Sequence, residues 1–345
     1  MILRRALSPL LLVAALACSG GYPGDPVPPP GNHGLRKGVV LGLFARRDAA
    51  GIRRDLEEIR ALGATSVCIV IPWVTPDVRS TEIRPRADMT PGDDPLRLSV
   101  RLAHRLGMSV LLMPIVYVDR MAAGEWRGTI DPPDWQAWFG AYGEMILRYA
   151  RLAADERAEM LSVGSELCST EGRRREWLDL IGKVRAIYAG RLTYSANWDH
   201  RESLSFAGAL DDVGMNAYFE LSRDPGATVE DLVRAWRPIL SEVAAWREGI
   251  GKPLILTEVG YPSRRGAAVD PWDYAERGSP DPESQERAYR AFTEAWTGFP
   301  HLAGVYFYLW WGSGGPADPG YTPRGKPAEN VLREWFASIG KGASP

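Results

Sequence analysis

Eight short apolar runs recur along the chain, and this alternation restricts the fold more than any other feature of the sequence. The runs cover residues 39–44, 66–73, 109–118, 160–167, 192–198, 213–219, 253–261 and 304–311. They are continuous and rich in Val, Ile and Leu, which is typical of strands that are buried on both faces of a parallel sheet.

Amphipathic segments with a helical period separate the runs. They cover residues 55–62, 96–106, 134–153, 173–188, 229–246, 283–296 and 327–339, whereas the connection 200–210 is short and weak. Gly63 and Gly107 stand where the first two helices are expected to stop. A strand and then a helix, eight times in about 300 residues, predicts an α/β fold made of a single (β/α)8 TIM barrel. The alternative is an open doubly wound sheet, which usually has a Gly-rich phosphate turn after its first strand, and none follows residues 39–44.

The amino terminus has the features of an export signal. Arg4 and Arg5 precede an apolar run over 7–16, followed by small residues, as in a secretory signal peptide. Residues 15–18 (Ala-Leu-Ala-Cys) resemble a bacterial lipobox, so we expect lipidation of Cys18; plain cleavage with an incidental cysteine is the alternative.

The chain therefore divides into four predicted parts. These are a signal peptide of the lipoprotein type (1–17), a Gly/Pro-rich tether (18–37), the barrel domain (38–339) and a short tail (340–345). We expect an exported protein held at the bacterial cell envelope by a lipid anchor, with a secreted soluble protein as the alternative.

Charge and composition exclude several classes of partner. The chain has 41 Lys plus Arg against 43 Asp plus Glu, a formal net charge of −2, whereas a nucleic-acid-binding protein needs a basic face. Only four His are present and no Cys/His cluster has zinc spacing, so we expect no metal and no cofactor. We expect Cys68 and Cys168 to be free thiols, and the protein to be a monomer.

Chemically active side chains stand where the apolar runs end. Glu166 follows the core of the fourth run and Glu258 that of the seventh. Catalytic residues of such barrels lie at the carboxyl ends of strands, and a pair of carboxylates with aromatic platforms is the set that glycoside hydrolysis requires. Either Glu could instead be structural, with Glu166 paired to an Arg such as Arg173. The candidate sugar-binding residues at the strand ends are Trp73, Tyr117, Asp119, Ser165, Asn197, Trp198, Asn216, Trp310 and Trp311.

These motifs resemble a known group of enzymes. The relevant segments are 162–167 (Ser-Val-Gly-Ser-Glu-Leu), 256–261 (Leu-Thr-Glu-Val-Gly-Tyr), 308–311 (Tyr-Leu-Trp-Trp) and the stretch 318–328. The order of the two Glu resembles clan A glycoside hydrolases. Within that clan the sequence is most similar to glycoside hydrolase family 113, whose founding activity is β-1,4-mannanase.

The resemblance implies roles for individual residues. Glu166 would be the general acid/base, Glu258 the nucleophile, and Tyr218 would hydrogen-bond the nucleophile. Trp310 or Trp311 would form the floor of the subsite in which the sugar is distorted.

One position departs from the clan pattern. Clan A members usually have Asn before the acid/base Glu, where it bonds the sugar 2-hydroxyl, and this chain has Ser165. Either Ser165 makes a weaker bond of that kind, or Asn197 or Asn216 replaces it.

Two functions are consistent with these features. The leading hypothesis is a retaining glycoside hydrolase that cleaves a β-1,4-linked hexose polysaccharide or oligosaccharide, with mannan as the first expectation. The alternative is a carbohydrate-binding surface lipoprotein that retains the barrel without turnover. Ser165 favours the alternative, and retention of both Glu and of Tyr218 favours the enzyme.

Overall fold

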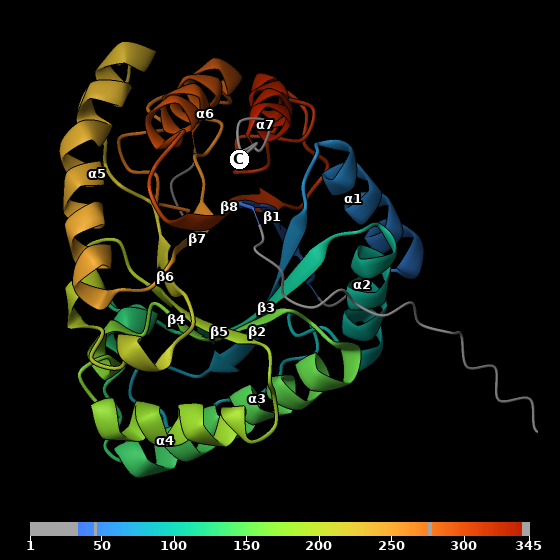
Figure 1. Cartoon of the computed structure of the whole chain (residues 1–345), viewed down its shortest axis with the longest axis vertical. Coiled ribbons are helices and arrows are strands. Elements are labelled where there is room, and N and C mark those ends of the chain that lie inside the picture. The colour runs from blue at the N-terminus through green and yellow to red at the C-terminus, as the bar shows by residue number, and fades with distance from the viewer. Residues whose placement is uncertain (1–33, 45–46, 275–277, 340–345) are drawn as a thin grey trace, which may run out of the picture. The chain divides into compact units, whose positions relative to one another are not determined.

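The structure is a computed structural model that describes residues 34–44, 47–274 and 278–339 (Figure 1). The predicted signal peptide, Cys18, most of the tether and the tail 340–345 lie outside the described residues. The first strand already begins at Arg36, two residues before the expected start of the barrel. Among the described residues, no helix combines the length and the apolar character that crossing a membrane requires.

Eight parallel strands form a closed barrel in the order of the sequence, as the apolar runs predict. Each strand pairs with the next one, and the last pairs with the first. The strands are β1 (Arg36–Gly42), β2 (Ser66–Thr75), β3 (Ser109–Val118), β4 (Met160–Ser165), β5 (Arg191–Ala196), β6 (Val213–Asn216), β7 (Leu254–Val259) and β8 (Leu302–Trp310). The (β/α)8 barrel is therefore confirmed, and the open doubly wound sheet is excluded.

Helices surround the barrel and account for most of the connections (Figure 1). They are α1 (Ala49–Ala61), α2 (Asp93–Arg105), α3 (Trp135–Glu156), α4 (Arg174–Arg185), α5 (Val229–Ile250), α6 (Pro282–Trp296) and α7 (Pro327–Ser338). The connection from β5 to β6, which is weak in the sequence, holds only the two 3-10 turns Arg201–Ser203 and Ala207–Ala209. Gly63 and Gly107 take φ values of 90° and 73° just after α1 and α2, a left-handed conformation that glycine adopts without a steric penalty.

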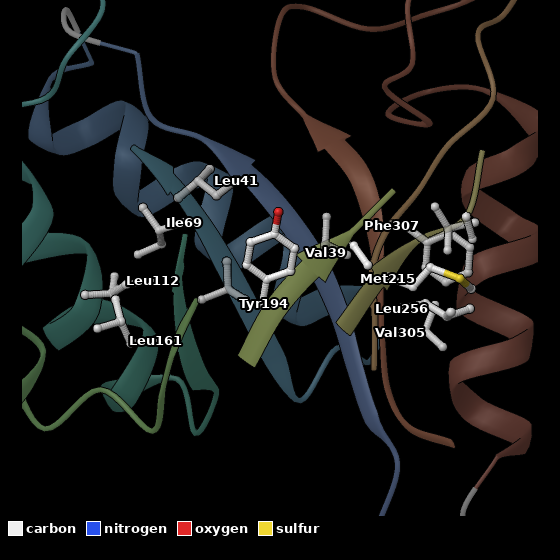
Figure 2. Close-up of a cluster of buried hydrophobic side chains, with 14 of the residues drawn as sticks. Val39, Leu41, Ile69, Leu112, Leu161, Tyr194, Met215, Leu256, Val305 and Phe307 are labelled. Atoms are coloured by element: carbon white, nitrogen blue, oxygen red, sulfur yellow. The ribbon is translucent and has the colours of Figure 1, made fainter. Parts of the chain in front are cut away.

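Two apolar layers fix the strands in place. Side chains on the outer face of the barrel pack against the helices, as the cluster around Leu41, Leu112 and Phe307 shows (Figure 2). A smaller cluster, with Val40, Cys68 and several neighbours, fills the interior of the barrel. Because both faces of each strand are covered, most strand positions are apolar or small; all ten residues of β2 are buried.

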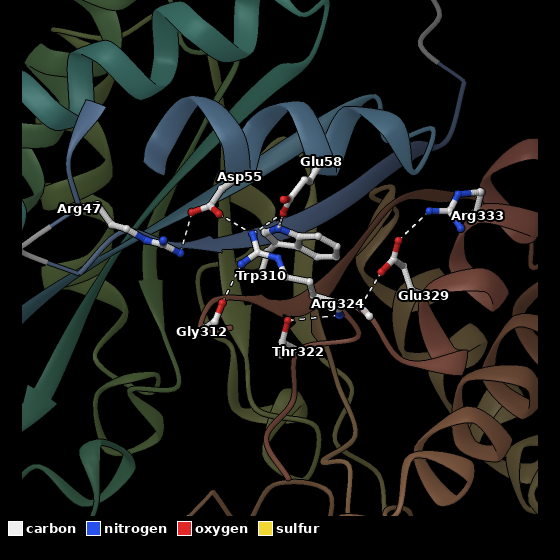
Figure 3. A network of polar contacts seen from close by, with 10 residues as sticks. Arg47, Asp55, Glu58, Trp310, Gly312, Thr322, Arg324, Glu329 and Arg333 are labelled. Atoms are coloured by element: carbon white, nitrogen blue, oxygen red, sulfur yellow. Dashed lines mark hydrogen bonds and ion pairs between the residues drawn. The ribbon is translucent and has the colours of Figure 1, made fainter. Parts of the chain in front are cut away.

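The segment after β8 is attached to α1 by a buried ionic network (Figure 3). The Asp55 carboxylate, 1% exposed, pairs with Arg47 at 2.6 Å and with Arg324. Arg324 also pairs with Glu58, donates to the Gly312 carbonyl oxygen and lies 4.9 Å from the centroid of the Trp310 ring. This network holds the chain between β8 and α7 against α1.

Candidate active site

Glu166 and Glu258 lie at the same end of the barrel, because the carboxyl ends of parallel strands meet at one mouth. Glu166 directly follows β4, and its backbone N–H donates to the Ser195 carbonyl oxygen of β5 at 2.9 Å. Its φ is +56°, a left-handed value that is uncommon for a residue with a side chain. Glu258 is the penultimate residue of β7. Both side chains are only partly exposed, with 15% exposure for Glu166.

Three tyrosines surround the Glu258 side chain. The Tyr218 hydroxyl donates to Glu258 Oε2 at 2.9 Å. The Tyr218 ring makes edge contacts with Tyr308 of β8 and with Tyr321, each with centroids 6.2 Å apart. Tyr308 and Tyr321 also contact one another, at 5.5 Å. The bond from Tyr218 predicted through the family resemblance is therefore present, and the two other rings restrict its movement.

Arg127 supplies a positive charge next to the two carboxyl groups. It belongs to the 3-10 turn Arg127–Thr129 after β3, and its Nε lies 3.6 Å from Glu166 Oε2. The alternative of a structural pair between Glu166 and Arg173 is not observed: Arg173 lies 3.7 Å from the carboxylate of Glu176 and stacks on Trp135. The ionic partner of Glu166 is thus Arg127, from the connection between β3 and α3.

The surroundings raise the pKa values of both carboxyl groups. Burial raises the pKa of Glu166, which the Arg127 charge lowers in part. Burial, followed by the charge of Glu166, raises the pKa of Glu258 to about 7, while Arg127 and the Tyr218 hydroxyl lower it. Two interacting carboxyl groups titrate as a pair, so ionisation of one disfavours ionisation of the other. One acid and one base side by side is the state that acid/base chemistry on a single bond requires.

Tyrosine 218 stays protonated in this environment. Burial, followed by the Glu258 charge, raises the pKa of Tyr218 well above its usual range. Its hydroxyl is therefore a permanent donor to Glu258.

Several other predicted residues lie near the mouth. Tyr117 is partly exposed near the end of β3. The Asn197 amide donates to Asp199 at 2.6 Å, and Asn216 Oδ1 accepts from the Trp198 backbone N–H at 2.9 Å. The Trp198 ring packs at 5.2 Å on Phe219, so only part of it is exposed.

Two buried polar atoms at the strand ends have no partner among the described residues. They are the hydroxyl of Ser165 and the Nδ2 group of Asn216. Both residues are almost completely buried, at 1% and 0% exposure, so each lacks a hydrogen bond that a bound group or water would supply.

Two predicted sugar-binding tryptophans do not reach the mouth. Trp73 is buried on the outer face of the barrel, where its Nε1 donates to the Tyr149 hydroxyl of α3 at 2.7 Å. Trp310 is 1% exposed, and its Nε1 donates to Glu58 of α1 at 3.1 Å (Figure 3). For these two residues the sequence-based expectation is wrong. Trp311 is 49% exposed and packs edge-on against Phe44, and Asp119 is an exposed partner of Arg86.

The sequence reasoning missed Arg127, Tyr308 and Tyr321. Tyr308 belongs to β8, and its ring contacts the Tyr218 ring beside Glu258. Over the described ranges 34–44, 47–274 and 278–339, no group of three or more His, Cys, Asp or Glu side chains is arranged to hold a metal ion.

Comparison with known proteins identifies the family. A model of Glycoside Hydrolase Family 113 matches residues 41–317, which is most of the chain. The protein belongs to glycoside hydrolase family 113. Family 113 proteins are glycosidases, so this chain is a glycoside hydrolase on a clan A barrel, as the resemblance predicts.

Solved structures agree with this assignment. A family 113 β-mannanase from Alicyclobacillus acidocaldarius, in complex with ManMIm, superposes with a TM-score of 0.80 and 28% identity over 89% of this chain and 99% of that one. A family 113 β-1,4-mannanase gives 0.79 and 24% identity over 89% and 100%. A family 5 subfamily 18 protein from Streptomyces cattleya, in complex with Manβ1-4GlcNAc, shares the fold with a TM-score of 0.61 and 15% identity over 90% and 82%. No curated protein sequence matches this family 113 chain.

Proposed function

We propose that this family 113 protein cleaves β-1,4-linked mannan or manno-oligosaccharides with retention of the anomeric configuration. The observation that carries the proposal is the pair of partly buried carboxyl groups at the ends of β4 and β7, with Tyr218 bonded to Glu258 at 2.9 Å. The choice of mannan is supported by the similarity to the β-mannanase from Alicyclobacillus acidocaldarius.

Glu258 is the proposed nucleophile. Its carboxylate attacks the anomeric carbon and forms a glycosyl-enzyme ester, while the bond from that carbon to the leaving oxygen breaks. The Tyr218 hydroxyl and the Arg127 charge favour the ionised form of Glu258 and therefore favour attack.

Glu166 is the proposed general acid/base. It gives its proton to the leaving oxygen in the first step, and its carboxylate then removes a proton from the water that hydrolyses the ester. Arg127, 3.6 Å away, stabilises the carboxylate that forms when the proton leaves.

Ser165 and Asn216 are the proposed ligands of a sugar hydroxyl beside Glu166. Each has a polar group without a hydrogen-bond partner among the described residues. Both groups are closed to solvent, so contact with a sugar hydroxyl requires a local rearrangement of these side chains. Asn197 is less suited to this role because its amide already donates to Asp199.

Substrate and stereochemistry are tested by hydrolysis. We expect reducing sugar to be released from mannan in a panel that also contains glucan, xylan and chitosan. We expect NMR of a fresh digest to show the β anomer first, because a double displacement retains the anomeric configuration. An α anomer as first product contradicts the double displacement, and binding of mannan without any release of sugar supports a non-catalytic lipoprotein instead.

Azide separates the two roles. Glu166→Ala is expected to lose roughly 10²–10⁴-fold on polysaccharide, because the leaving oxygen is no longer protonated. On an activated aryl glycoside its first step survives, and azide restores turnover with a β-glycosyl azide as product. Glu258→Ala is expected to lose turnover on every substrate and to give an α-glycosyl azide. The opposite pattern would exchange the roles, and wild-type rates in both variants would make the two residues structural.

We also propose that the protein is exported and lipidated at Cys18. The charged start, the apolar run over 7–16 and the Ala-Leu-Ala-Cys sequence support this proposal. Intact-mass measurement on the membrane fraction is expected to show a chain that starts at Cys18 with added lipid. A different start, or no lipid mass at Cys18, contradicts the anchor.

A further inference from the structure

We propose that Trp272, with Glu220 at its edge, forms an additional sugar-binding platform at the rim of the mouth. The platform would bind a hexopyranose unit of the polysaccharide at a distance from the cleaved bond. This inference rests on the proposed function for its ligand, and it adds a binding site outside the residues that act on the bond.

The Trp272 ring is large, apolar and open to solvent. It is 48% exposed in the connection between β7 and α6, and Tyr274, two residues later, is 68% exposed. Most Trp side chains of this protein that the structure describes are buried among other rings, so an exposed ring on a loop has a different role.

The position of Trp272 follows from a chain of contacts that begins at Glu258. Tyr218 donates to Glu258, and its ring contacts Tyr321. The Tyr321 hydroxyl donates to the Pro271 carbonyl oxygen at 2.6 Å, and Trp272 is the next residue. The platform therefore lies outside the ring of tyrosines, on the Glu258 side of the mouth, and receives a different sugar from the one that is cleaved.

Two hydrogen bonds restrict the position of the Trp272 ring. Its Nε1 donates to Glu220 Oε1 at 3.0 Å, and Glu220 follows Tyr218 by two residues. The Leu221 backbone N–H donates to the Ala268 carbonyl oxygen at 2.9 Å, which ties the connection after β6 to that after β7. A ring fixed before binding loses little conformational entropy when a ligand packs on it.

The chemistry of the pair suits a sugar. The C–H groups of a pyranose ring form an apolar face that packs on an aromatic ring, and its hydroxyls donate to carboxylate oxygens. Trp272 offers the ring, and the exposed carboxylate of Glu220 offers acceptors beside it.

Tyr274 is a second exposed aromatic side chain of the same connection. Burial raises the pKa of Tyr308 most, followed by the Glu258 charge, and the Tyr274 phenol acts in the same direction. That effect is consistent with a phenol near the tyrosines around Glu258.

The test compares substrates of different length. For Trp272→Ala we expect kcat/KM on mannohexaose to fall by up to about tenfold, the loss of one aromatic stacking contact. We expect kcat/KM on the shortest manno-oligosaccharide that the wild type cleaves to stay unchanged. Trp272→Phe keeps a ring and is expected to retain most of the activity on mannohexaose.

Two kinetic results would overturn the platform. One is an equal loss on all lengths for Trp272→Ala, which would mean that the loop has only a structural role. The other is an unchanged rate on mannohexaose.

Affinity electrophoresis in a gel that contains soluble galactomannan tests the platform without any catalysis. We expect the gel to retard the wild type and Trp272→Phe more than Trp272→Ala. Equal retardation of all three refutes the platform. If the wild type cleaves none of the oligosaccharides, the proposed function fails, and this gel still decides on the platform.

Discussion

Removing a single hydroxyl from the site tests the proposed roles through the pH dependence of the reaction. In Tyr218→Phe the ring stays between Tyr308 and Tyr321, and only the 2.9 Å hydrogen bond to Glu258 is lost. That bond lowers the pKa of Glu258. Its loss therefore raises the pKa of the proposed nucleophile.

The size of the change follows from the strength of the bond. A hydrogen bond to a charged group is worth about 1.5–3 kcal/mol, and 1.36 kcal/mol corresponds to one pH unit, so we expect the pKa of Glu258 to rise by about 1–2. Glu258 acts when ionised, so its activity is present above its pKa and is lost as the pH falls through it. The acidic limb of kcat/KM is then expected to move to higher pH by about 1–2, and the rate below that limb to fall by about 10–100-fold.

The assay is the rate of hydrolysis of a manno-oligosaccharide from pH 4 to pH 9. Tyr321→Phe is the matched control, because it removes the same atom from a neighbouring ring whose hydroxyl bonds to the Pro271 carbonyl oxygen and not to a carboxylate. We expect the control to keep the wild-type acidic limb. An acidic limb that is identical in Tyr218→Phe and the wild type would refute the assignment of that limb to Glu258.

Further expectations concern other parts of the site and the barrel. Arg127 lowers the pKa values of both carboxyl groups, so Arg127→Gln is expected to move both limbs of the pH–rate profile to higher pH. Arg127→Lys keeps the charge and is expected to leave the limbs near their wild-type positions. Limbs that do not move in Arg127→Gln contradict this role. Asp55→Ala leaves Arg47 and Arg324 without their buried partner and is expected to lower the free energy of unfolding in urea by about 3–5 kcal/mol. Asp131→Ala removes one partner of an exposed ion pair and is expected to leave the free energy of unfolding nearly unchanged. Equal effects of the two substitutions would contradict the network. At Gly164 an added Cβ meets the Tyr194 ring at 2.7 Å, so Gly164→Ala is expected to lower stability in thermal unfolding by about 1–3 kcal/mol. Gly140→Ala adds its Cβ in open space on α3 and is expected to stabilise the protein by about 0.5–1 kcal/mol. A neutral effect of Gly164→Ala refutes the close packing.

The architecture was predictable because of how a barrel buries its strands. Helices cover the outside and side chains fill the inside, so most strand positions are apolar. The runs at 66–73 and 109–118 lie within or coincide with β2 and β3. The same continuous apolar pattern does not show whether a side chain points into the barrel or toward the helices. Trp73 and Trp310 stand at strand ends as expected, but the continuous apolar pattern gives no period-2 signal, and both rings project toward helices.

Part of the site was predictable for a related reason. A Glu in an otherwise apolar strand carries a large burial cost, so Glu166 and Glu258 stand out from their neighbours. Arg127 and Tyr321 lie in connections, where the path of the backbone depends on tertiary contacts. Arg127 is one of many arginines in this chain, and nothing in its local sequence separates it from those in surface ion pairs.

The left-handed backbone at Glu166 implies a trade between stability and activity. A residue with a side chain loses about 1–2 kcal/mol in that conformation, and burial of the carboxyl group adds to the cost. The fold tolerates the strained backbone and the buried carboxyl group at position 166, because the proposed acid/base acts there. Glu166→Gly is therefore expected to unfold at the same or a higher urea concentration than the wild type, although glycine weakens most other positions. Glycine at position 166 is thus expected to remove the reactive group without weakening the barrel.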